Sequence, residues 1–255
     1  KTGILSKIDT LVNLPLAVNV AFSTALVPVI SGAIAQKDME TASKRMTFSV
    51  FASLLIVLPC AAGFIALAQP ILNLIYPSAN DGATLMMYSI SMVFIALNQT
   101  VNGGLYGLNK TYIPLIGVVT GAIIKLILNI ILISNPNIEI TGAAISSIIS
   151  QGIAFAICTI ALIKNIKLNL KFGRMIIAPI FASAFMGICT FFVNQLLNNI
   201  VGNKLSTVIS IIIGALIYVT TILVSKILKK EEILMIPFGT KIYNLLVKLR
   251  IYKEE

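Results

Sequence analysis

Long apolar stretches alternate with short polar joints along almost the whole chain. About seven stretches reach the roughly 20 residues that an α-helix needs to cross a bilayer. They cover residues 10–35, 46–67, 84–108, 112–134, 141–163, 175–197 and 205–228. The joints are rich in turn-forming Asn, Pro, Gly and Asp. Because helices satisfy their own backbone groups in lipid, and the strict alternation of a barrel strand is missing, the pattern predicts an all-α, polytopic transmembrane helix bundle.

The composition supports a surface that faces lipid. The chain has 255 residues, of which 58% are hydrophobic and only 11% charged, whereas a soluble domain is about a quarter charged. Its mean hydropathy is +0.99. The sequence begins at Lys1 without an initiator Met, and its first apolar run starts almost at once. We therefore expect it to lack the N-terminal part of a longer protein.

Basic residues predict the topology. If successive joints lie on opposite sides of the membrane, one side carries Lys1, Lys7 and Lys204. The other side carries Lys37, Lys44, Arg45, Lys110, Lys164, Lys167, Lys171, Arg174 and all basic residues from Lys226 onward. Because basic residues concentrate in cytoplasmic loops, the first span is expected to run from outside to inside and the C-terminus to be cytoplasmic.

The net charge of +10 does not indicate a nucleic-acid partner, because it is spread over successive loops instead of forming one basic surface. Residues 231–255 differ from the rest. Ile242, Leu245, Leu246 and Leu249 recur at helical spacing among basic residues. They predict an amphipathic tail on the anionic cytoplasmic leaflet, with a solvated tail as the alternative.

Polar residues inside the predicted spans are the candidate functional residues. Lys125 lies deep in the fourth span and continues a stripe, at four-residue spacing, that begins at Gly117 and Gly121 and ends at Asn129. Small residues on such a stripe permit close helix packing. Lys125 either attracts an anionic substrate group such as a pyrophosphate, or pairs structurally with a carbonyl or with a carboxylate of the missing half.

Other embedded amides and hydroxyls cluster in the same way. Gln99, Asn102 and Tyr106 share a face of the third span, Ser147, Ser150 and Gln151 share one in the fifth, and Asn19 and Ser23 are one turn apart in the first. Such groups either line a cavity or hydrogen-bond neighbouring helices. The candidate cavity residues are Lys125, Asn129, Gln99, Asn102, Gln151 and Asn19.

The sequence shows no set of residues that would support catalysis. The chain has no His, and Cys60, Cys158 and Cys189 lie in apolar runs without metal-ligand or disulfide spacing. No nucleophile–base pair can be assembled, and none of the predicted spans contains an acidic residue. We expect neither an enzyme nor a cofactor or metal.

Four segments carry a resemblance to a known family: TLVNLPLA at residues 10–17, STALVP at 23–28, AQPILNLIY at 68–76 and KLILN at 125–129. Most of residues 1–175 resembles the polysaccharide-biosynthesis, stage V sporulation protein B-like branch of the multidrug/oligosaccharidyl-lipid/polysaccharide (MOP) flippase superfamily. Its relatives include the lipid II flippases and the MATE drug exporters.

The resemblance implies about fourteen helices in two lobes around a central cavity, of which this chain holds the second lobe of a MATE-like transporter. Residues 1–175 would form that lobe without its first helix, 176–230 two additional transmembrane helices and 231–255 the cytoplasmic tail. The partners implied are membrane lipids, an undecaprenyl-pyrophosphate-linked sugar and the missing N-terminal lobe.

The function expected is alternating-access flipping of a lipid-linked oligosaccharide or peptidoglycan precursor across the plasma membrane. One alternative is a cation-coupled exporter of the MATE type, which favours an embedded acidic residue. Another is a non-transporting scaffold for cell-wall synthesis, which predicts that Lys125 tolerates replacement by Leu or Met.

Overall fold

A computed structural model of the chain describes residues 2–77, 81–133, 139–166, 173–225 and 227–228. In these ranges the chain forms helices and no strand. They are α1 (Thr2–Ala35), α2 (Met39–Ala66), α3 (Ala68–Ile75), α4 (Gly82–Gly107), α5 (Tyr112–Ile133), α6 (Glu139–Asn165), the π-helical turn η1 (Gly173–Ile177), α7 (Ala178–Val201) and α8 (Asn203–Val224). Seven of the described helices are long and apolar enough to cross a membrane, which confirms the predicted polytopic bundle.

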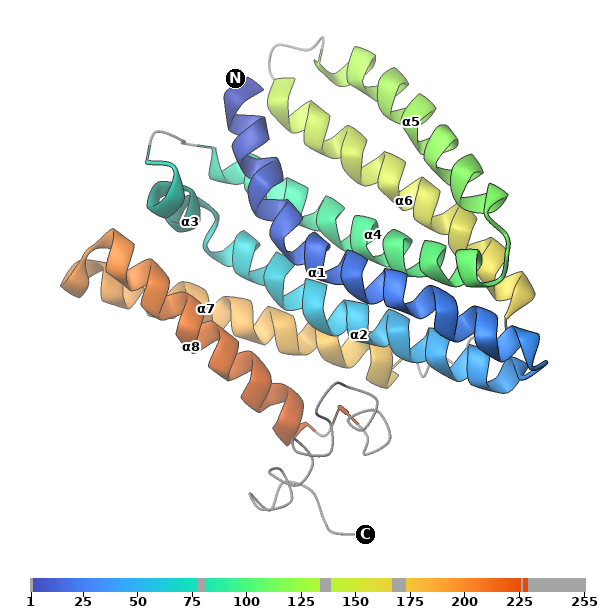
Figure 1. Cartoon of the computed structure of the whole chain (residues 1–255). Coiled ribbons are helices and arrows are strands. Elements are labelled where there is room, and N and C mark those ends of the chain that lie inside the picture. The colour runs from blue at the N-terminus through green and yellow to red at the C-terminus, as the bar shows by residue number, and fades with distance from the viewer. Residues whose placement is uncertain (1, 78–80, 134–138, 167–172, 226, 229–255) are drawn as a thin grey trace.

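The helices pack in a spatial order that departs from the chain order (Figure 1). Helix α5 contacts chiefly α6, α6 contacts α4, and α4 also packs against both α1 and α2. On the other side α2 contacts α7, and α7 pairs with α8. Helix α4 therefore lies at the centre of the bundle, between the α5–α6 pair and the remaining helices. The predicted division between residues 175 and 176 stays a prediction, and the predicted amphipathic tail lies outside the described residues.

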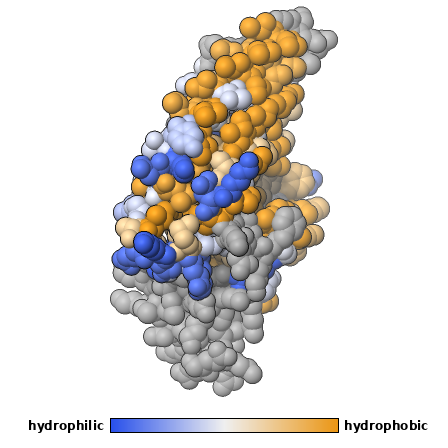
Figure 2. Space-filling model, turned by 90° about the vertical axis from the view of Figure 1, so that its right-hand side faces the viewer, coloured by the Kyte–Doolittle hydropathy of each residue, from blue (hydrophilic) through white to orange (hydrophobic). Residues whose placement is uncertain are grey.

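The outer surface is mainly apolar. Figure 2 shows hydrophobic residues over most of one side of the molecule, with hydrophilic residues gathered in its lower half. Helix α5 contributes strongly, because its exposed residues include Leu115, Ile116, Val118, Val119, Ile123, Leu126, Ile127, Ile130, Ile131 and Ile133. A surface of this kind is stable against lipid tails and unstable in water.

The start of the first span was predicted wrongly. Helix α1 begins at Thr2, and its apolar span begins at Leu5 instead of Thr10. Ile8 is completely buried and belongs to a core with α2, α3 and α4, so packing extends the helix through a polar segment. The Lys7 ammonium lies 5.2 Å from the centre of the Tyr76 ring, a favourable cation–π distance.

This extension places Asp9 inside a membrane-spanning helix. Asp9 lies one residue before the predicted start of this span, so the predicted spans themselves contain no acidic residue.

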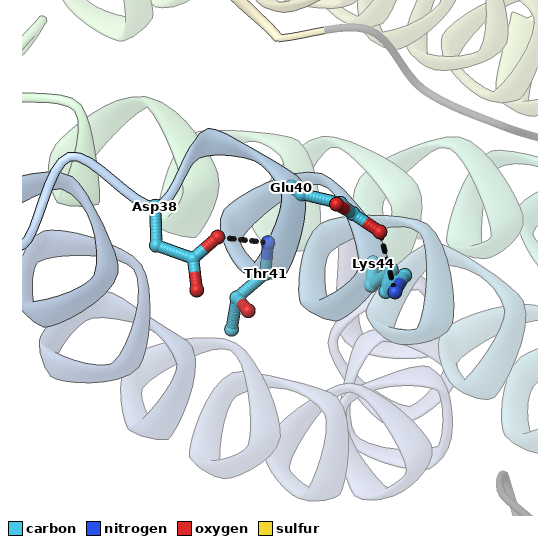
Figure 3. Close-up of polar contacts among 4 residues, drawn as sticks. All are labelled: Asp38, Glu40, Thr41 and Lys44. Atoms are coloured by element: carbon cyan, nitrogen blue, oxygen red, sulfur yellow. Dashed lines mark hydrogen bonds and ion pairs between the residues drawn. The ribbon is translucent and has the colours of Figure 1, made fainter.

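The connector between α1 and α2 is built from local hydrogen bonds (Figure 3). Lys37 adopts a left-handed conformation with φ 59°, which ends α1. The Asp38 carboxylate accepts a hydrogen bond of 2.9 Å from the Thr41 backbone N–H and thereby caps α2. Hydrogen bonds from the Thr41 hydroxyl and backbone hold the pKa of Asp38 below its usual value. One turn into α2, Lys44 pairs with Glu40 at 2.7 Å. The predicted polar joint is thus a defined helix–turn–helix corner.

Two features were absent from the predicted element list. The short helix α3 follows α2 after a single residue, Leu67, and contributes the buried Ile71 and Leu72 to the core with α1 and α4. The π-helical turn η1 precedes α7, and Pro179 lies in the first turn of α7, inside the span Gly173–Val201. Because proline has no N–H, the first helical turn tolerates it without losing a hydrogen bond.

Candidate functional site

Asn19 joins three helices from a fully buried position. Its amide nitrogen on α1 donates to the Ala96 carbonyl at 2.8 Å and to the Gln99 amide oxygen at 3.0 Å, both on α4. Its amide oxygen accepts a hydrogen bond of 2.7 Å from the Ser53 hydroxyl on α2. One turn further along α1, the Ser23 hydroxyl donates to the Gln99 carbonyl at 2.6 Å. In this conformation Asn19 holds helices together and reaches no open surface.

Tyr88, Gln99, Asn102 and Tyr106 lie along one side of α4, since their spacing places them within about 60° of one another around the helix axis. Gln99 lies at the edge of this side next to α1, where its amide oxygen accepts the hydrogen bond from Asn19 and the buried Gly103 packs against Ser23. Tyr106 is exposed, whereas the other three are half-buried. The buried Asn102 Oδ1 has no hydrogen-bond partner among the described residues. We call this side the polar face of α4.

The glycine stripe of α5 packs directly on α6. A methyl group on Gly117 would lie 2.8 Å from the Cys158 sulfur, and one on Gly121 would lie 3.1 Å from the Ser150 carbonyl oxygen. The predicted close packing through these glycines is confirmed. Two turns further along, Asn129 accepts a hydrogen bond from the Ser146 hydroxyl of α6. Lys125 lies between these contacts and is half-buried.

Asp9 of α1 and Ser147 of α6 both lie near Tyr88 of α4, an arrangement that the sequence alone did not indicate. The Asp9 carboxylate on α1 lies within electrostatic range of Tyr88 on α4 and of Lys125 on α5, without a direct ion pair to Lys125. The Tyr88 hydroxyl is hydrogen-bonded to Ser147 of α6. Asp9 escaped the sequence reasoning because it falls one residue before the predicted start of the first span. The Tyr88–Ser147 hydrogen bond therefore joins α4 to α6 near Asp9 of α1.

Gln151 is the remaining predicted residue. It lies one turn beyond Ser147 on α6 and is half-buried. The neighbouring hydroxyls of Ser147 and Ser150 donate to backbone carbonyls of their own helix, so the polar groups of this segment are partly satisfied locally. Whether Gln151 and the other predicted residues line a cavity stays a prediction.

A second feature is an apolar groove on the opposite side of the bundle. It has a volume of about 750 Å³ and is bordered by α2, α4 and α7, with Leu58, Ile65, Ile90, Phe94, Phe191 and Phe192 among its lining residues. Ser183 is the one hydroxyl-bearing side chain in the lining. Such a surface matches a hydrocarbon chain better than a sugar or a charged group.

Metal chemistry finds no support in the described ranges, where no group of three His, Cys, Asp or Glu side chains is placed to hold an ion. The three cysteines are free thiols; Cys158 is buried, and Cys60 and Cys189 are half-buried.

Comparison with known proteins adds independent information. A profile of the family described as lipid II flippase MurJ matches residues 4–210. The chain is 24% identical over 247 residues to the uncharacterized membrane protein YabM of Bacillus subtilis (strain 168), which covers 94% of this chain and 46% of that protein. It is 23% identical over 235 residues to stage V sporulation protein B of the same organism, covering 89% and 44%.

Solved structures agree in fold. A lipid II flippase MurJ in an inward closed conformation superimposes with a TM-score of 0.67 at 19% identity, covering 86% of this chain and 46% of that one. An inward-facing multidrug resistance transporter of the MATE family gives a TM-score of 0.52 at 16% identity, covering 85% and 56%. The chain thus spans about half the length of the curated relatives it matches.

Proposed function

Because this chain belongs to the lipid II flippase MurJ family, we propose that it forms part of a transporter that flips a lipid-linked oligosaccharide or peptidoglycan precursor across the plasma membrane by alternating access. Membership of the MOP flippase superfamily, expected from the four sequence segments, is confirmed by the family match and by the relatives. Seven apolar helices make the chain a multi-pass membrane protein.

The observation that carries this proposal is the position of Lys125. Inserting a lysine at the centre of a membrane helix costs about 2.5–3.5 kcal/mol, and Lys125 lies eight residues from the end of α5, or about 12 Å along the helix. It is half-buried on a helix whose exposed neighbours Ile123 and Leu126 face lipid. A cation held at this depth is suited to attract the pyrophosphate of a lipid-linked sugar.

The apolar groove supports a lipid-linked substrate rather than a free sugar. Its phenylalanine and isoleucine lining lies on membrane-spanning helices, where a polyprenyl chain would meet no polar group except Ser183. A sugar headgroup beside Lys125 and a hydrocarbon chain in the bilayer would then occupy surfaces of matching polarity.

The polar face of α4 needs a partner surface in the bilayer, because exposed polar side chains are unfavourable against lipid tails. In the two-lobe arrangement that the resemblance implies, a first lobe covers this face and encloses the substrate. The basic connectors, including the corner with Lys37 and Lys44 (Figure 3), would lie in the cytoplasm together with the C-terminus.

The test is translocation by the full-length protein. Lys125→Ala removes one charge-assisted contact of about 1.5–3 kcal/mol, so we expect translocation of the lipid-linked substrate to fall by about 10–100-fold. Lys125→Glu should reduce it further, because it repels the anion. Lys164→Ala is the matched control, since Lys164 is exposed in the last turn of α6.

Normal expression with failed complementation of a flippase-depleted strain is the expected outcome for both Lys125 variants. Full complementation by both would remove Lys125 from the transport mechanism. If Lys125→Leu and Lys125→Met also complement fully, the scaffold alternative gains support instead.

A second candidate function is cation-coupled drug export of the MATE type. The position of Asp9 inside the α1 span favours it, because an embedded carboxylate is the kind of group that couples transport to protons or sodium ions. The two candidates differ in cargo. Drug efflux that depends on Asp9, without translocation of a polyprenyl-linked substrate, would select the exporter.

A further inference from the structure

Pro59 removes one backbone hydrogen bond from α2. It lies inside the helix, and because proline has no N–H, the Leu55 carbonyl four residues earlier loses the partner that any other residue at position 59 would provide. Lipid tails cannot replace that bond, so in a membrane helix a donor has to come from a neighbouring side chain or an ordered water. Helix α2 is therefore weakened between Leu55 and Pro59.

Tyr218 of α8 supplies the missing donor. Its hydroxyl donates to the Leu55 carbonyl oxygen at 2.9 Å, although the two residues are 163 positions apart in the chain. The Tyr218 side chain is half-buried and packs, like Leu55, against the core that contains Phe51 and Ile222. Helices α2 and α8 otherwise touch each other little, so this bond is a specific link between them.

The weakened segment lies between two hydrophobic cores. Phe51, which precedes it, packs in one core with residues of α7 and α8. Ala61, which follows it, packs in another core with residues of α1, α3 and α4. The two parts of α2 are thus held in different cores, and the chain from Leu55 to Pro59 joins them.

An apolar cavity of about 350 Å³ adjoins this segment. It lies between α2 and α3 on one side and α7 and α8 on the other, and Pro59, Cys60, Gly63 and Tyr218 are among its lining residues. A methyl group added to Gly63 would come no closer than 3.9 Å to its nearest neighbour, the end of Met186. Close-packed interiors rarely leave such room, so α2 can change its bend here without overlapping a neighbour.

We propose that the segment from Leu55 to Pro59 is a hinge of α2 and that the Tyr218 hydroxyl is its latch. With the bond made, α2 keeps the bend of this structure. With the bond broken, the Leu55 carbonyl is released and α2 bends toward the adjoining cavity. The use of this hinge in transport rests on the proposed function, because alternating access requires parts of the bundle to move against one another. Tyr218 is a positioning residue that acts through α2.

The first experiment tests the latch in the purified full-length protein without substrate. Tyr218→Phe keeps the ring and removes the hydroxyl, so the equilibrium constant of unfolding in SDS mixed micelles should rise about 3–20-fold, the range that hydrogen bonds between membrane helices produce. Pro59→Ala gives the Leu55 carbonyl a donor from its own helix, and in that background the effect of Tyr218→Phe should largely disappear.

Tyr112→Phe is the matched control for the loss of a tyrosine hydroxyl. Tyr112 is exposed at the start of α5, and its replacement should leave the unfolding equilibrium nearly unchanged. An equal effect of Tyr218→Phe with Pro59 and with Ala at position 59 would overturn the latch, because a role of Tyr218 in packing alone does not depend on the missing N–H.

The second experiment measures movement at the hinge. Cys60 follows Pro59 directly, is a half-buried free thiol and lines the cavity, so its alkylation by N-ethylmaleimide, read at this residue by peptide mass spectrometry, reports opening. Tyr218→Phe should raise the rate about 3–20-fold, and Pro59→Ala should lower it. Cys158, buried on α6, is the internal control and should react equally in all variants. An unchanged Cys60 rate in Tyr218→Phe would show that no hinge is released.

The third experiment asks whether transport uses the hinge. Pro59→Ala stiffens α2 and leaves Lys125 and the polar face of α4 intact. Binding of an undecaprenyl-pyrophosphate-linked sugar in nanodiscs should therefore stay unchanged, while its translocation should fall about 3–20-fold, because the restored bond is of the same kind as the latch. Normal translocation by Pro59→Ala would remove the hinge from the transport cycle.

The outcomes separate this proposal from the proposed function. If the unchanged protein neither binds nor translocates the lipid-linked sugar, while Tyr218→Phe and Pro59→Ala show the expected coupling and Cys60 rates, the hinge is real and the proposed substrate is wrong. If translocation is observed and the two substitutions act independently, the latch is wrong and the proposed function stands.

Discussion

Gly103 is the position where a single methyl group should damage the bundle most clearly. A Cβ atom there would lie 2.7 Å from the Ser23 carbonyl oxygen and 2.8 Å from the Ser23 hydroxyl oxygen on α1. Weak C–H···O contacts settle at about 3.3–3.6 Å, so α1 and α4 would have to separate by roughly 0.6 Å. The neighbouring bonds from Ser23 to the Gln99 carbonyl and from Asn19 to the Ala96 carbonyl resist this movement.

The magnitude follows from two opposing effects. Overpacking of this size costs about 1–3 kcal/mol, while replacing a helical Gly by Ala contributes up to about 1 kcal/mol of stabilisation. Gly103→Ala should therefore destabilise the protein by about 0–3 kcal/mol. Gly152→Ala is the matched control, because a Cβ at Gly152 on α6 has no atom within 4 Å. The helix-propensity effect cancels between the two variants, and their difference should be about 1–3 kcal/mol.

A third variant grades the effect. At Gly104 the added methyl would meet the sulfur and terminal methyl of Met46, a flexible side chain that can move. Gly104→Ala should therefore fall between the other two. Unfolding by SDS in mixed micelles, followed by circular dichroism, gives the three free energies of unfolding. A Gly103→Ala protein as stable as Gly152→Ala would refute the tight α1–α4 contact.

Two further variants address the buried amide and the connector. Asn19→Leu removes three short hydrogen bonds, and such bonds between membrane helices average about 0.6 kcal/mol each. The same SDS titration should therefore show a loss of about 2 kcal/mol or more in the free energy of unfolding. Thr24→Ala is the control and should change little, because the Thr24 hydroxyl is exposed and bonds only its own helix. The pKa of Asp38 is lowered in the folded protein, so its cap is fully present above a pH of about 4 and is lost as the pH falls through the folded-state pKa. Amide exchange at Thr41 should therefore accelerate in acid in the unchanged protein and not in Asp38→Asn. Equal acceleration in both proteins would contradict the cap.

The sequence was sufficient for the spans because length and apolarity alone decide whether a helix crosses a bilayer. The sequence did not predict where the first helix starts, because that start depends on tertiary contacts that hydropathy does not describe. The segment around Lys7 and Asp9 is polar on average, yet it continues α1 because Ile8 packs into the core and the Tyr76 ring covers Lys7. Both contacts depend on residues that lie far away in the chain.

The candidate site was recoverable only in part. Spacing along one helix places Gln99, Asn102 and Tyr106 on a common face, and the structure agrees. Spacing along one helix does not show which neighbouring helix or cavity its side chains contact. Asn19 resembled a cavity residue in sequence, but its partners on α2 and α4 stand 34 to 80 residues away, and they bury it.

The two ends of the bundle join the α5–α6 pair to the other helices in different ways. At the end near the basic connectors, Leu162 of α6 belongs to one buried core with Ile30, Met46 and Leu105 from α1, α2 and α4. At the outer end the buried core of α1, α2, α3 and α4 includes no described residue of α5 or α6. There α4 and α6 meet through the Tyr88–Ser147 hydrogen bond and through the rings of Phe94 and Phe155, whose centroids lie 6.3 Å apart.

This difference matters for transport. Separating a buried core uncovers apolar side chains, whereas a hydrogen bond or charge pair can be exchanged for water or a substrate headgroup at a small net cost. Moving the α5–α6 pair at the end near the basic connectors would therefore uncover Leu162 and its partners in the shared core, whereas the opposite end has no such shared core to break. The proposed substrate cation Lys125 lies in the half of α5 toward that opposite end, so a headgroup bound there would act on the α5–α6 pair where no shared buried core holds it.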